Sequence, residues 1–222
     1  MKDTILIIGI NGSLGKEIKK YYESKNNFQV FGTTSNIKNV TKNIFLLDFL
    51  NIETIKNFKN LNINHLIITS GYEPKYNLKN INLKHLNKMF NIHVIGPMML
   101  IQKMQNMFKK NSTITFLSSP AALQGSYDPS YSAVKGATNS LVRTLAKDLA
   151  PNIRVNALSP SLIKDSTVYK SMTNDFKNKH LNNTLNKKLL LANECVNAID
   201  FILKNNHYTG QILHLNGGMI YG

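Results

Sequence analysis

Tyr131 and Lys135 are the residues of this sequence whose types and spacing most directly suggest chemistry. They lie four positions apart in the run from Ser130 to Ala137, so on a helix the phenol and the ammonium group share one face. A nearby positive charge favours the tyrosinate and lowers the pKa of a phenol from its usual value of about 10. We therefore expect Tyr131 to donate a proton near neutral pH, with a chance pair on an ordinary helix as the alternative.

A glycine-rich turn near the start of the chain is typical of a site that binds phosphate groups. The run from Gly9 to Gly15 directly follows the apolar residues Ile5 to Ile8 and precedes a helical pattern. Glycine allows the tight dihedral angles and close backbone approach that such a turn needs, and the free N–H groups of the helix then face a pyrophosphate. We expect a dinucleotide to be bound here by Gly9, Asn11, Gly12, Ser13, Leu14 and Gly15.

The end of the second predicted strand bears on which dinucleotide is bound. NAD-binding domains usually hold the ribose 2′-hydroxyl with an acidic residue about twenty positions beyond the glycines. This chain has Thr33, Thr34 and Ser35 instead, with Lys38 close by. Hydroxyl groups and a lysine suit a 2′-phosphate, and this run has no carboxylate to repel one. We therefore favour NADP(H) over NAD(H), with a polar turn that binds nothing as the structural alternative.

Short apolar runs alternate with longer segments of helical spacing along the chain. Strands are predicted at 5–8, 28–31, 44–47, 66–68, 113–117, 153–157 and 211–215, and helices at 14–22, 83–108, 130–149 and 194–203. This alternation predicts a doubly wound, Rossmann-like α/β fold with a mostly parallel seven-stranded sheet and helices on both faces. We expect one domain over residues 1–222, in which the weakly patterned stretch from Lys164 to Lys188, within about residues 161–190, covers the substrate.

The composition excludes several other classes of protein. Among the 222 residues Cys195 is the single cysteine, which excludes an internal disulfide, and the six histidines lack ligand-like spacing, so no metal site is expected. The net charge of +15 comes from scattered lysines rather than dense basic blocks, so we expect no nucleic-acid partner. No run is long enough to span a membrane and none resembles a signal peptide, so we expect no membrane partner and a cytoplasmic location.

Several motifs in order resemble the short-chain dehydrogenase/reductase family over nearly the whole chain. The Tyr-x-x-x-Lys pair falls at Tyr131 and Lys135, and a strand that ends in Ser118 and Ser119 precedes it. Residues 152–160 (NIRVNALSP) are similar to the family's IRVNAVAPG strand, and residues 209–218 (TGQILHLNGG) are similar to its closing TGQxIxVDGG strand. The resemblance implies an oxidoreductase that binds a nicotinamide cofactor.

The resemblance also implies roles for single residues. Tyr131 would be the acid/base, Lys135 would lower its pKa and hold the nicotinamide ribose, and Ser119 would orient the reacting carbonyl. Ser118 is the nearest competitor of Ser119, and either serine would otherwise cap a turn at the strand end. The family's fourth catalytic residue is an asparagine three positions before a glycine, and alignment on Gly96 places His93 there. A histidine can carry a proton relay, although a structural hydrogen bond is the alternative and Asn91 lies two positions earlier.

The remaining cofactor contacts match the family less closely. The positions implied to contact the cofactor are Asp48, Phe49, Ser70, Gly71, Pro160 and Ile163. The aspartate resembles the family residue that contacts adenine, with a turn or helix-capping aspartate as the alternative. Only the glycine of the family's NAG turn is kept, and serine replaces the glycine that usually follows Pro160.

The expected function is that of an NADP(H)-dependent oxidoreductase that reduces a small-molecule carbonyl or oxidises the matching alcohol. Hydride transfer develops negative charge on the substrate oxygen, and Tyr131 would supply the proton. The alternatives are a non-catalytic NADP(H)-binding sensor or scaffold and, with less support, a nucleotide-sugar-modifying enzyme. The resemblance also implies a homodimer or homotetramer, and Met98, Met99, Met104 and Met107 suit core or subunit packing.

Overall fold

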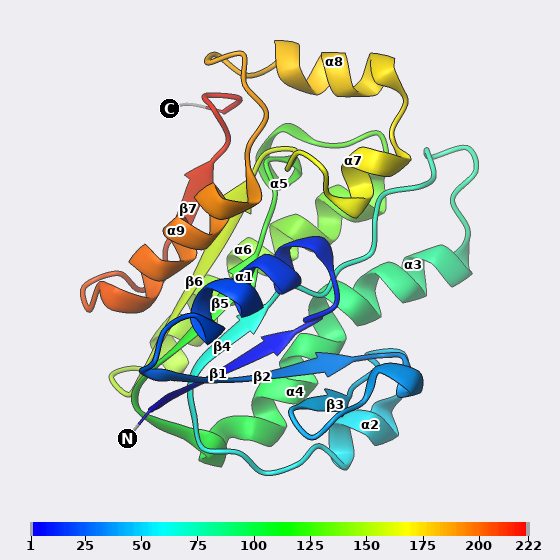
Figure 1. Ribbon diagram of the computed structural model, residues 1–222. Helices are drawn as coiled ribbons and strands as arrows, with labels where there is room; N and C mark the ends of the chain where they lie inside the picture. The colour runs from blue at the N-terminus through cyan, green and yellow to red at the C-terminus, as the bar shows by residue number, and fades with distance from the viewer. Residues whose placement is uncertain (1, 221–222) are drawn as a thin grey trace.

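A seven-stranded sheet forms the centre of the protein (Figure 1), in a computed structural model that describes residues 2–220. The strands are β1 (Asp3–Ile8), β2 (Phe28–Thr34), β3 (Ile44–Leu46), β4 (Ile63–Ile68), β5 (Phe108–Leu117), β6 (Ile153–Pro160) and β7 (Ile212–Leu215). Their order is β3-β2-β1-β4-β5-β6-β7, and every neighbouring pair is parallel. The strand order reverses between β1 and β4, so the predicted doubly wound fold is confirmed.

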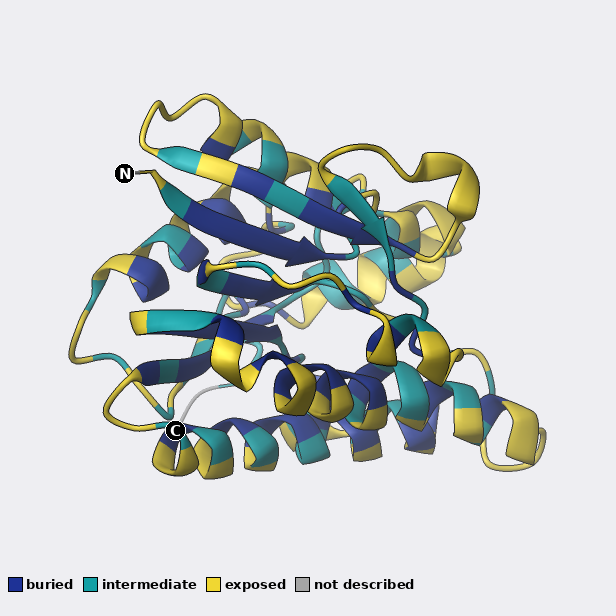
Figure 2. Cartoon of the chain, turned by 90° about the horizontal axis from the view of Figure 1, so that it is seen from below, coloured by how far each residue is buried: buried dark blue, intermediate teal, exposed yellow. Residues whose placement is uncertain are grey.

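Helices cover both faces of the sheet because successive strand residues point to opposite faces and both sets are apolar. In β1, Leu6 and Ile8 join a buried cluster with residues of α2 (Ile52–Lys56), α4 (Gly96–Met104) and α6 (Pro129–Asp148). The alternate residues of β1 join a second cluster with α1 (Ser13–Glu23) and α9 (Ala192–Lys204). Figure 2 shows the central strands largely dark blue, whereas β2 and the edge strands also carry teal or yellow segments.

The helix predicted over residues 83–108 is divided in the structure. α3 (Leu83–Phe90) passes through a π-helical turn, η2 (Asn91–Ile95), into α4 and then a short 3₁₀ turn, η3 (Gln105–Met107). Pro97 lacks an N–H group for the carbonyl four residues earlier, and in the wider turn the N–H of Gly96 bonds to the carbonyl of Asn91. The predicted helix end was wrong, because Phe108 already begins β5 and a single apolar residue fits either period.

The weakly patterned stretch folds as two short helices, α7 (Thr167–Ser171) and α8 (Asn174–Asn182). Ser166 and Thr173 precede them and accept hydrogen bonds from the N–H groups of the first helical turns. In Figure 1 this pair, in yellow and orange, lies beyond the tips of the strands. We call residues 161–190 the covering segment. The remaining short elements are η1 (Ile37–Asn39) and α5 (Ala121–Gln124).

The methionines of the central helix divide into two groups. Met104 and Met107 are buried in the core, whereas Met98 and Met99 are exposed on α4. The first pair therefore has the predicted core role, and the second pair lies on the surface of this chain. Within the described residues, no helix has both the length and the apolar character needed to cross a membrane.

Candidate active site

A cleft of about 1140 Å³ lies where the strands end at their carboxyl edge. It is lined from one side by the turns after β1 and β2, and from the other by the ends of β5 and β6, α6 and the covering segment. The predicted site residues that line it are Gly9, Asn11, Gly12, Ser13, Leu14, Thr33, Thr34, Ser35, Asp48, Phe49, Ser70, Gly71, His93, Ser119, Tyr131, Lys135, Pro160 and Ile163. Gly15, Lys38 and the alternative relay residue Asn91 do not line the cleft.

The glycine turn packs closely against its neighbours, which explains two of its glycines. Gly9 has a φ of +83°, and a methyl group there would lie 2.9 Å from the amide nitrogen of Ser70. A methyl group on Gly15 would lie 2.5 Å from the carbonyl oxygen of Gly9. Gly15 therefore lets the first turn of α1 pack on the glycine turn, so the structure gives it a packing role rather than a contact with the cleft.

The residues at the ends of β2 and β3 form the other end of the cleft. The hydroxyl of Thr33 accepts a hydrogen bond of 3.2 Å from the N–H of Gly9, so this buried threonine also holds the glycine turn. The carboxylate of Asp48 accepts a bond of 3.0 Å from the N–H of Leu50, as expected of a turn aspartate. Lys38 lies in η1 and is not part of the cleft lining.

Ser118 and Ser119, at the end of β5, have different surroundings. The hydroxyl of Ser118 is buried and donates to the side-chain oxygen of Asn139 at 2.5 Å. Ser119 lines the cleft, where its hydroxyl accepts a bond of 3.2 Å from the N–H of Ala121 and interacts with the Tyr131 side chain. Ser119 can still donate its proton toward the cleft, whereas the hydroxyl proton of Ser118 is already used.

Tyr131 and Lys135 lie on α6 as the spacing predicts. The ammonium nitrogen of Lys135 is 5.5 Å from the centre of the Tyr131 ring and donates a hydrogen bond of 2.8 Å to the carbonyl of Leu117. Burial lowers the pKa of Lys135 to about 7. Burial also raises the pKa of Tyr131, and the interaction with Ser119 only opposes this shift. The sequence predicts that Lys135 lowers the pKa of this phenol, but in the chain by itself desolvation raises it, and the interaction that opposes the rise comes from Ser119.

His93 lies in the π-helical turn η2, with its ring nearly perpendicular to that of Tyr131 at a centroid distance of 6.0 Å. Its Nε2 atom is 3.0 Å from both the backbone nitrogen and the backbone oxygen of Tyr72, and one tautomer satisfies one of these contacts at a time. Burial, with a smaller contribution from Lys135, lowers the pKa of His93 to about 3. A neutral ring bound to the backbone fits the structural alternative well, and the proton relay stays a prediction.

Comparisons with known proteins place this site in a family. A family model described as enoyl-(acyl carrier protein) reductase matches residues 52–220. The chain belongs to the short-chain dehydrogenase/reductase family. It is 30% identical to a 3-oxoacyl-(acyl-carrier-protein) reductase FabG from Buchnera aphidicola subsp. Baizongia pistaciae (strain Bp), over 98% of this chain and 97% of that protein. As a member of this family, the chain is an oxidoreductase that acts on CH–OH groups.

Solved structures share the same fold over the full length of the chain. A 4-hydroxyisoleucine dehydrogenase complexed with NADH superimposes with a TM-score of 0.88 at 22% identity, and the match covers 100% of both chains. A small-chain dehydrogenase in complex with NADPH superimposes with a TM-score of 0.87 at 23% identity, again over 100% of both chains. At this level of identity the likeness establishes the fold of this dehydrogenase/reductase.

The structure also adds cleft residues that the sequence did not single out. They come from the loop after β4, the end of α5, the loop before α6 and the covering segment, and they include Tyr72, Glu73, Pro74, Gln124, Tyr127, Met172, Phe176, Lys179, His180 and Asn183. Spacing on α8 could have indicated some of them, because residues 176, 179, 180 and 183 share one helix face. The loop residues carried no such signal, since only tertiary packing brings them to the cleft.

The covering segment is bound to the glycine turn of this dehydrogenase/reductase. The hydroxyl of Ser13 accepts a bond of 3.0 Å from the N–H of Thr167, and the two hydroxyl oxygens are also 3.0 Å apart. Farther along, Ser171 donates a bond of 3.3 Å to the carboxylate of Glu73. The segment therefore contacts both the cofactor side and the opposite wall of the cleft.

The part of the chain that the structure describes contains no group of three or more metal-ligating side chains. Cys195 is buried on α9, in the core and outside the cleft lining. Its burial raises the pKa of its thiol to about 12, so the thiolate is scarce at neutral pH. The polar groups that surround Tyr131 in the cleft include the hydroxyl of Ser119 and the amine of Lys135.

Proposed function

We propose that this protein transfers hydride between NADP(H) and a carbonyl or alcohol substrate, with Tyr131 as the acid/base. One observation carries the proposal: the hydroxyl of Tyr131, the hydroxyl of Ser119 and the ammonium group of Lys135 meet in the cleft that the glycine turn also lines. A proton donor, a hydrogen-bond donor and a cation near a phosphate-binding turn are the parts that carbonyl reduction requires.

The residues present fit a nicotinamide dinucleotide along the cleft. The glycine turn and the N-terminus of α1 would hold the pyrophosphate, and Asp48 and Phe49 lie near the adenine end. Lys135 uses one of its three N–H groups on the carbonyl of Leu117, which leaves two for the ribose hydroxyls. The orphaned hydroxyl of Ser70, buried with no partner beside the glycine turn, is a further group that a ligand could satisfy.

Preference for NADP(H) rests on Thr33, Thr34 and Ser35. These hydroxyl residues line the cleft where a carboxylate would repel a 2′-phosphate, and the net charge of +15 favours the more anionic dinucleotide. The related structures include one with NADPH and one with NADH, so the preference depends on this local argument.

The protein's own groups account for the proton and for charge stabilisation. The bound nicotinamide would supply or accept the hydride. Because burial raises the pKa of Tyr131, its phenol stays protonated at neutral pH and can donate to the developing alkoxide. Ser119 would donate a second hydrogen bond to the same oxygen. The covering segment would exclude water from this end of the cleft.

Turnover of a panel of carbonyl compounds by the wild type and by the Tyr131→Phe variant tests the proposal. NADPH oxidation is measured with simple ketones, sugars, steroid ketones and a 3-oxoacyl thioester, the last because of the curated relative's printed activity. Tyr131→Phe should lower kcat by roughly 100-fold or more while NADPH still binds. Tyr208→Phe removes a phenol outside the cleft lining and should leave kcat near that of the wild type.

Two outcomes would contradict the proposal. A wild-type protein that binds NADPH and turns over none of the panel would support the non-catalytic sensor or scaffold. Faster turnover with NADH than with NADPH would overturn the argument from Thr33, Thr34 and Ser35. The acid/base role of Tyr131 would then still be tested by the Tyr131→Phe variant.

A further inference from the structure

Asp128, the residue before α6, has a carboxylate that is completely buried and fully engaged in hydrogen bonds. Oδ1 accepts bonds from the helix that bears the proton donor: from the N–H of Ser130 at 3.0 Å, the hydroxyl of Ser130 at 2.5 Å and the N–H of Tyr131 at 3.3 Å. This oxygen therefore fixes the backbone of Tyr131 at the start of the helix.

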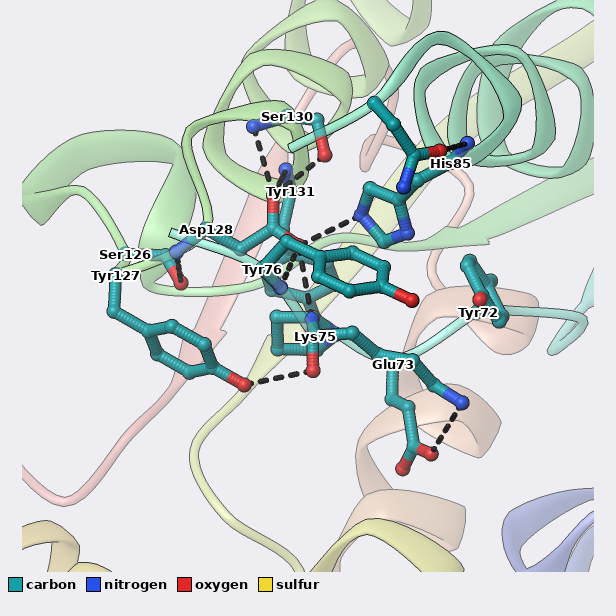
Figure 3. A network of polar contacts seen from close by, with 12 residues as sticks. Tyr72, Glu73, Lys75, Tyr76, His85, Ser126, Tyr127, Asp128, Ser130 and Tyr131 are labelled. Carbon is teal, nitrogen blue, oxygen red and sulfur yellow. Dashed lines mark hydrogen bonds and ion pairs between the residues drawn. The ribbon is translucent and has the colours of Figure 1, made fainter. Parts of the chain in front are cut away.

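The second oxygen of Asp128 binds two other segments of the chain. Oδ2 accepts bonds of 2.9 Å and 3.3 Å from the N–H groups of Lys75 and Tyr76, and one of 2.8 Å from Nε2 of His85 on α3. Figure 3 shows these three groups converging on the carboxylate from the side opposite to Ser130. One side chain thus joins α6, α3 and the loop after β4.

That loop forms a wall of the proposed substrate cleft. Tyr72, Glu73 and Pro74 line the cleft, and the backbone of Tyr72 holds the ring of His93. The loop has no regular secondary structure, so its position depends on bonds such as those to Asp128. The hydroxyl of Tyr127 adds one more, a bond of 2.7 Å to the carbonyl of Pro74.

Helix capping by itself does not require a buried charge at this position. Other helices of the chain begin at neutral residues, such as Asn82 before α3, Ser166 before α7 and Thr173 before α8. Burial raises the pKa of Asp128, but the bonds from Ser130, Lys75, Tyr76 and His85 together lower it to about 2, so the group remains a carboxylate. Two charged oxygens are needed because donors approach from both sides.

We propose that Asp128 is a positioning residue that sets the distance between Tyr131 and the wall formed by residues 72–76. The inference rests on the proposed function, since it concerns how Tyr131 faces a substrate. Its physical basis is that proton and hydride transfer are sensitive to small displacements of the donor, while cofactor binding at the glycine turn lies elsewhere in the cleft.

The Asp128→Asn substitution tests the two sets of hydrogen bonds of this side chain separately. The amide oxygen can still cap α6, but the amide N–H₂ group then faces the N–H donors of Lys75, Tyr76 and His85. We expect kcat for the best substrate of the panel to fall roughly 10- to 100-fold, with a raised KM for that substrate and an unchanged Kd for NADPH. A larger primary isotope effect with NADPH deuterated at the transferred position should accompany the loss, because the transfer step becomes slower.

Asp200→Asn is the matched control for lost stability. Asp200 accepts a hydrogen bond from the hydroxyl of Tyr22 and pairs with Lys204, away from the cleft lining. A variant that is only less stable loses active molecules, which lowers the apparent kcat without changing KM or the isotope effect. Asp200→Asn should therefore lower the midpoint of thermal unfolding and leave KM and the isotope effect as in the wild type.

His85 provides the conservative rescue. His85→Gln keeps an N–H donor that can reach Oδ2 of Asp128, whereas His85→Leu removes it and leaves the carboxylate short of one bond. We expect the glutamine variant to retain most of the wild-type kcat and the leucine variant to show the defect of Asp128→Asn in milder form.

Hydrogen exchange tests whether Asp128 holds the loop, and this measurement needs no substrate. Asp128→Asn should accelerate exchange of the amides of Lys75 and Tyr76, and Asp200→Asn should not. Unchanged exchange at these amides, or kinetics of Asp128→Asn that match Asp200→Asn, would overturn the positioning role. A wild-type protein without turnover on the panel would instead count against the proposed function, and the exchange result would still confirm or refute that Asp128 holds the loop.

Discussion

At the residue scale, two adjacent serines show how small differences in contact separate structure from chemistry. Ser118 donates to the buried side chain of Asn139, while Ser119 faces the cleft beside Tyr131. The side chains are chemically the same, so the different tasks come from where the end of β5 directs each hydroxyl. This pair allows a matched experiment within two neighbouring positions.

Alanine at each serine should give opposite results. Ser119→Ala removes a hydrogen bond to the developing alkoxide and should lower kcat by about 10²-fold with little change in thermal stability. Ser118→Ala leaves the Asn139 side chain unsatisfied in the core and should lower the free energy of unfolding by about 1–3 kcal/mol. Steady-state kinetics and thermal unfolding of both variants check this. A larger fall in kcat for Ser118→Ala than for Ser119→Ala would assign the hydrogen bond to the alkoxide to Ser118 instead.

Lys135 has its charge in a buried position, which costs stability in the absence of ligand. Burial lowers its pKa from the ordinary value of 10.5 to about 7. Below pH 7 the folded chain carries the buried ammonium and bears the full cost of burying it. Between pH 7 and 10.5 the unfolded chain binds more protons than the folded chain, so this contribution to stability rises with pH. Above 10.5 the lysine is neutral in both states and the cost vanishes.

Replacement of this lysine by methionine should reveal that cost. Without added cofactor, Lys135→Met should raise the free energy of unfolding by a few kcal/mol at pH 6, and the gain should shrink steadily toward pH 10. Denaturant unfolding of wild type and variant across this pH range measures the difference. A gain that does not depend on pH would mean that the amine is hydrated and that its pKa is ordinary.

At the element scale, the covering segment contains two short helices, α7 and α8, that bury little of their surface. It is attached to the glycine turn through Ser13 and Thr167 and to the opposite wall through Ser171 and Glu73. α7 and α8 contribute no fully buried residue to the core. A segment with so few buried contacts opens at a lower free energy than the sheet.

Cofactor binding should therefore protect this segment from proteolysis. Lysines of the covering segment, such as Lys164, Lys170 and Lys177, provide tryptic sites. At saturating NADPH we expect cleavage there to slow by about tenfold or more, because the bound state stabilises the closed segment. Thr167→Val removes one hydroxyl contact to Ser13 and should reduce the protection. Mass spectrometry of timed digests checks both, and equal cleavage with and without NADPH would exclude a covering role.

At the scale of the whole molecule, the exposed apolar residues of the central helix suggest contact with a second copy of the chain. Ile95, Met98 and Met99 are exposed to 47%, 47% and 38%, and they lie together in sequence at the start of α4. Neighbouring apolar side chains of this size on one helix are expensive to leave in water. The same chain carries a net charge of +15, which opposes association through any non-specific contact.

We expect the wild-type protein to be a homodimer or homotetramer in solution. The double variant Met98→Lys with Met99→Lys places two further positive charges at this surface and should shift the protein toward the monomer. Leu78→Lys, in an exposed loop, adds charge elsewhere and should leave the assembly unchanged. Light scattering coupled to size exclusion measures the mass of each, and a monomeric wild type would contradict the expectation.

The order of the elements follows from the sequence because it depends on interactions between near neighbours. Apolar runs and helical spacing predicted all seven strands and the helices that carry the site, and the glycine turn and the Tyr131–Lys135 spacing correctly placed their own residues in the cleft, except Gly15. The same patterns missed two local details, the π-helical turn before Pro97 and the start of β5 at Phe108. Short helices such as α2 and α5 have too few residues to show a period.

Only the tertiary structure decided which groups meet across long stretches of chain. Asp128 lies more than 40 residues from His85 and more than 50 from Lys75, and no periodicity relates these positions. Tertiary packing likewise decided the burial that raises the pKa of Tyr131, and the different surroundings of Ser118 and Ser119. The physical reason is that residue propensity and apolar spacing along the chain favour each element locally, whereas desolvation and side-chain partners depend on how the elements pack against one another.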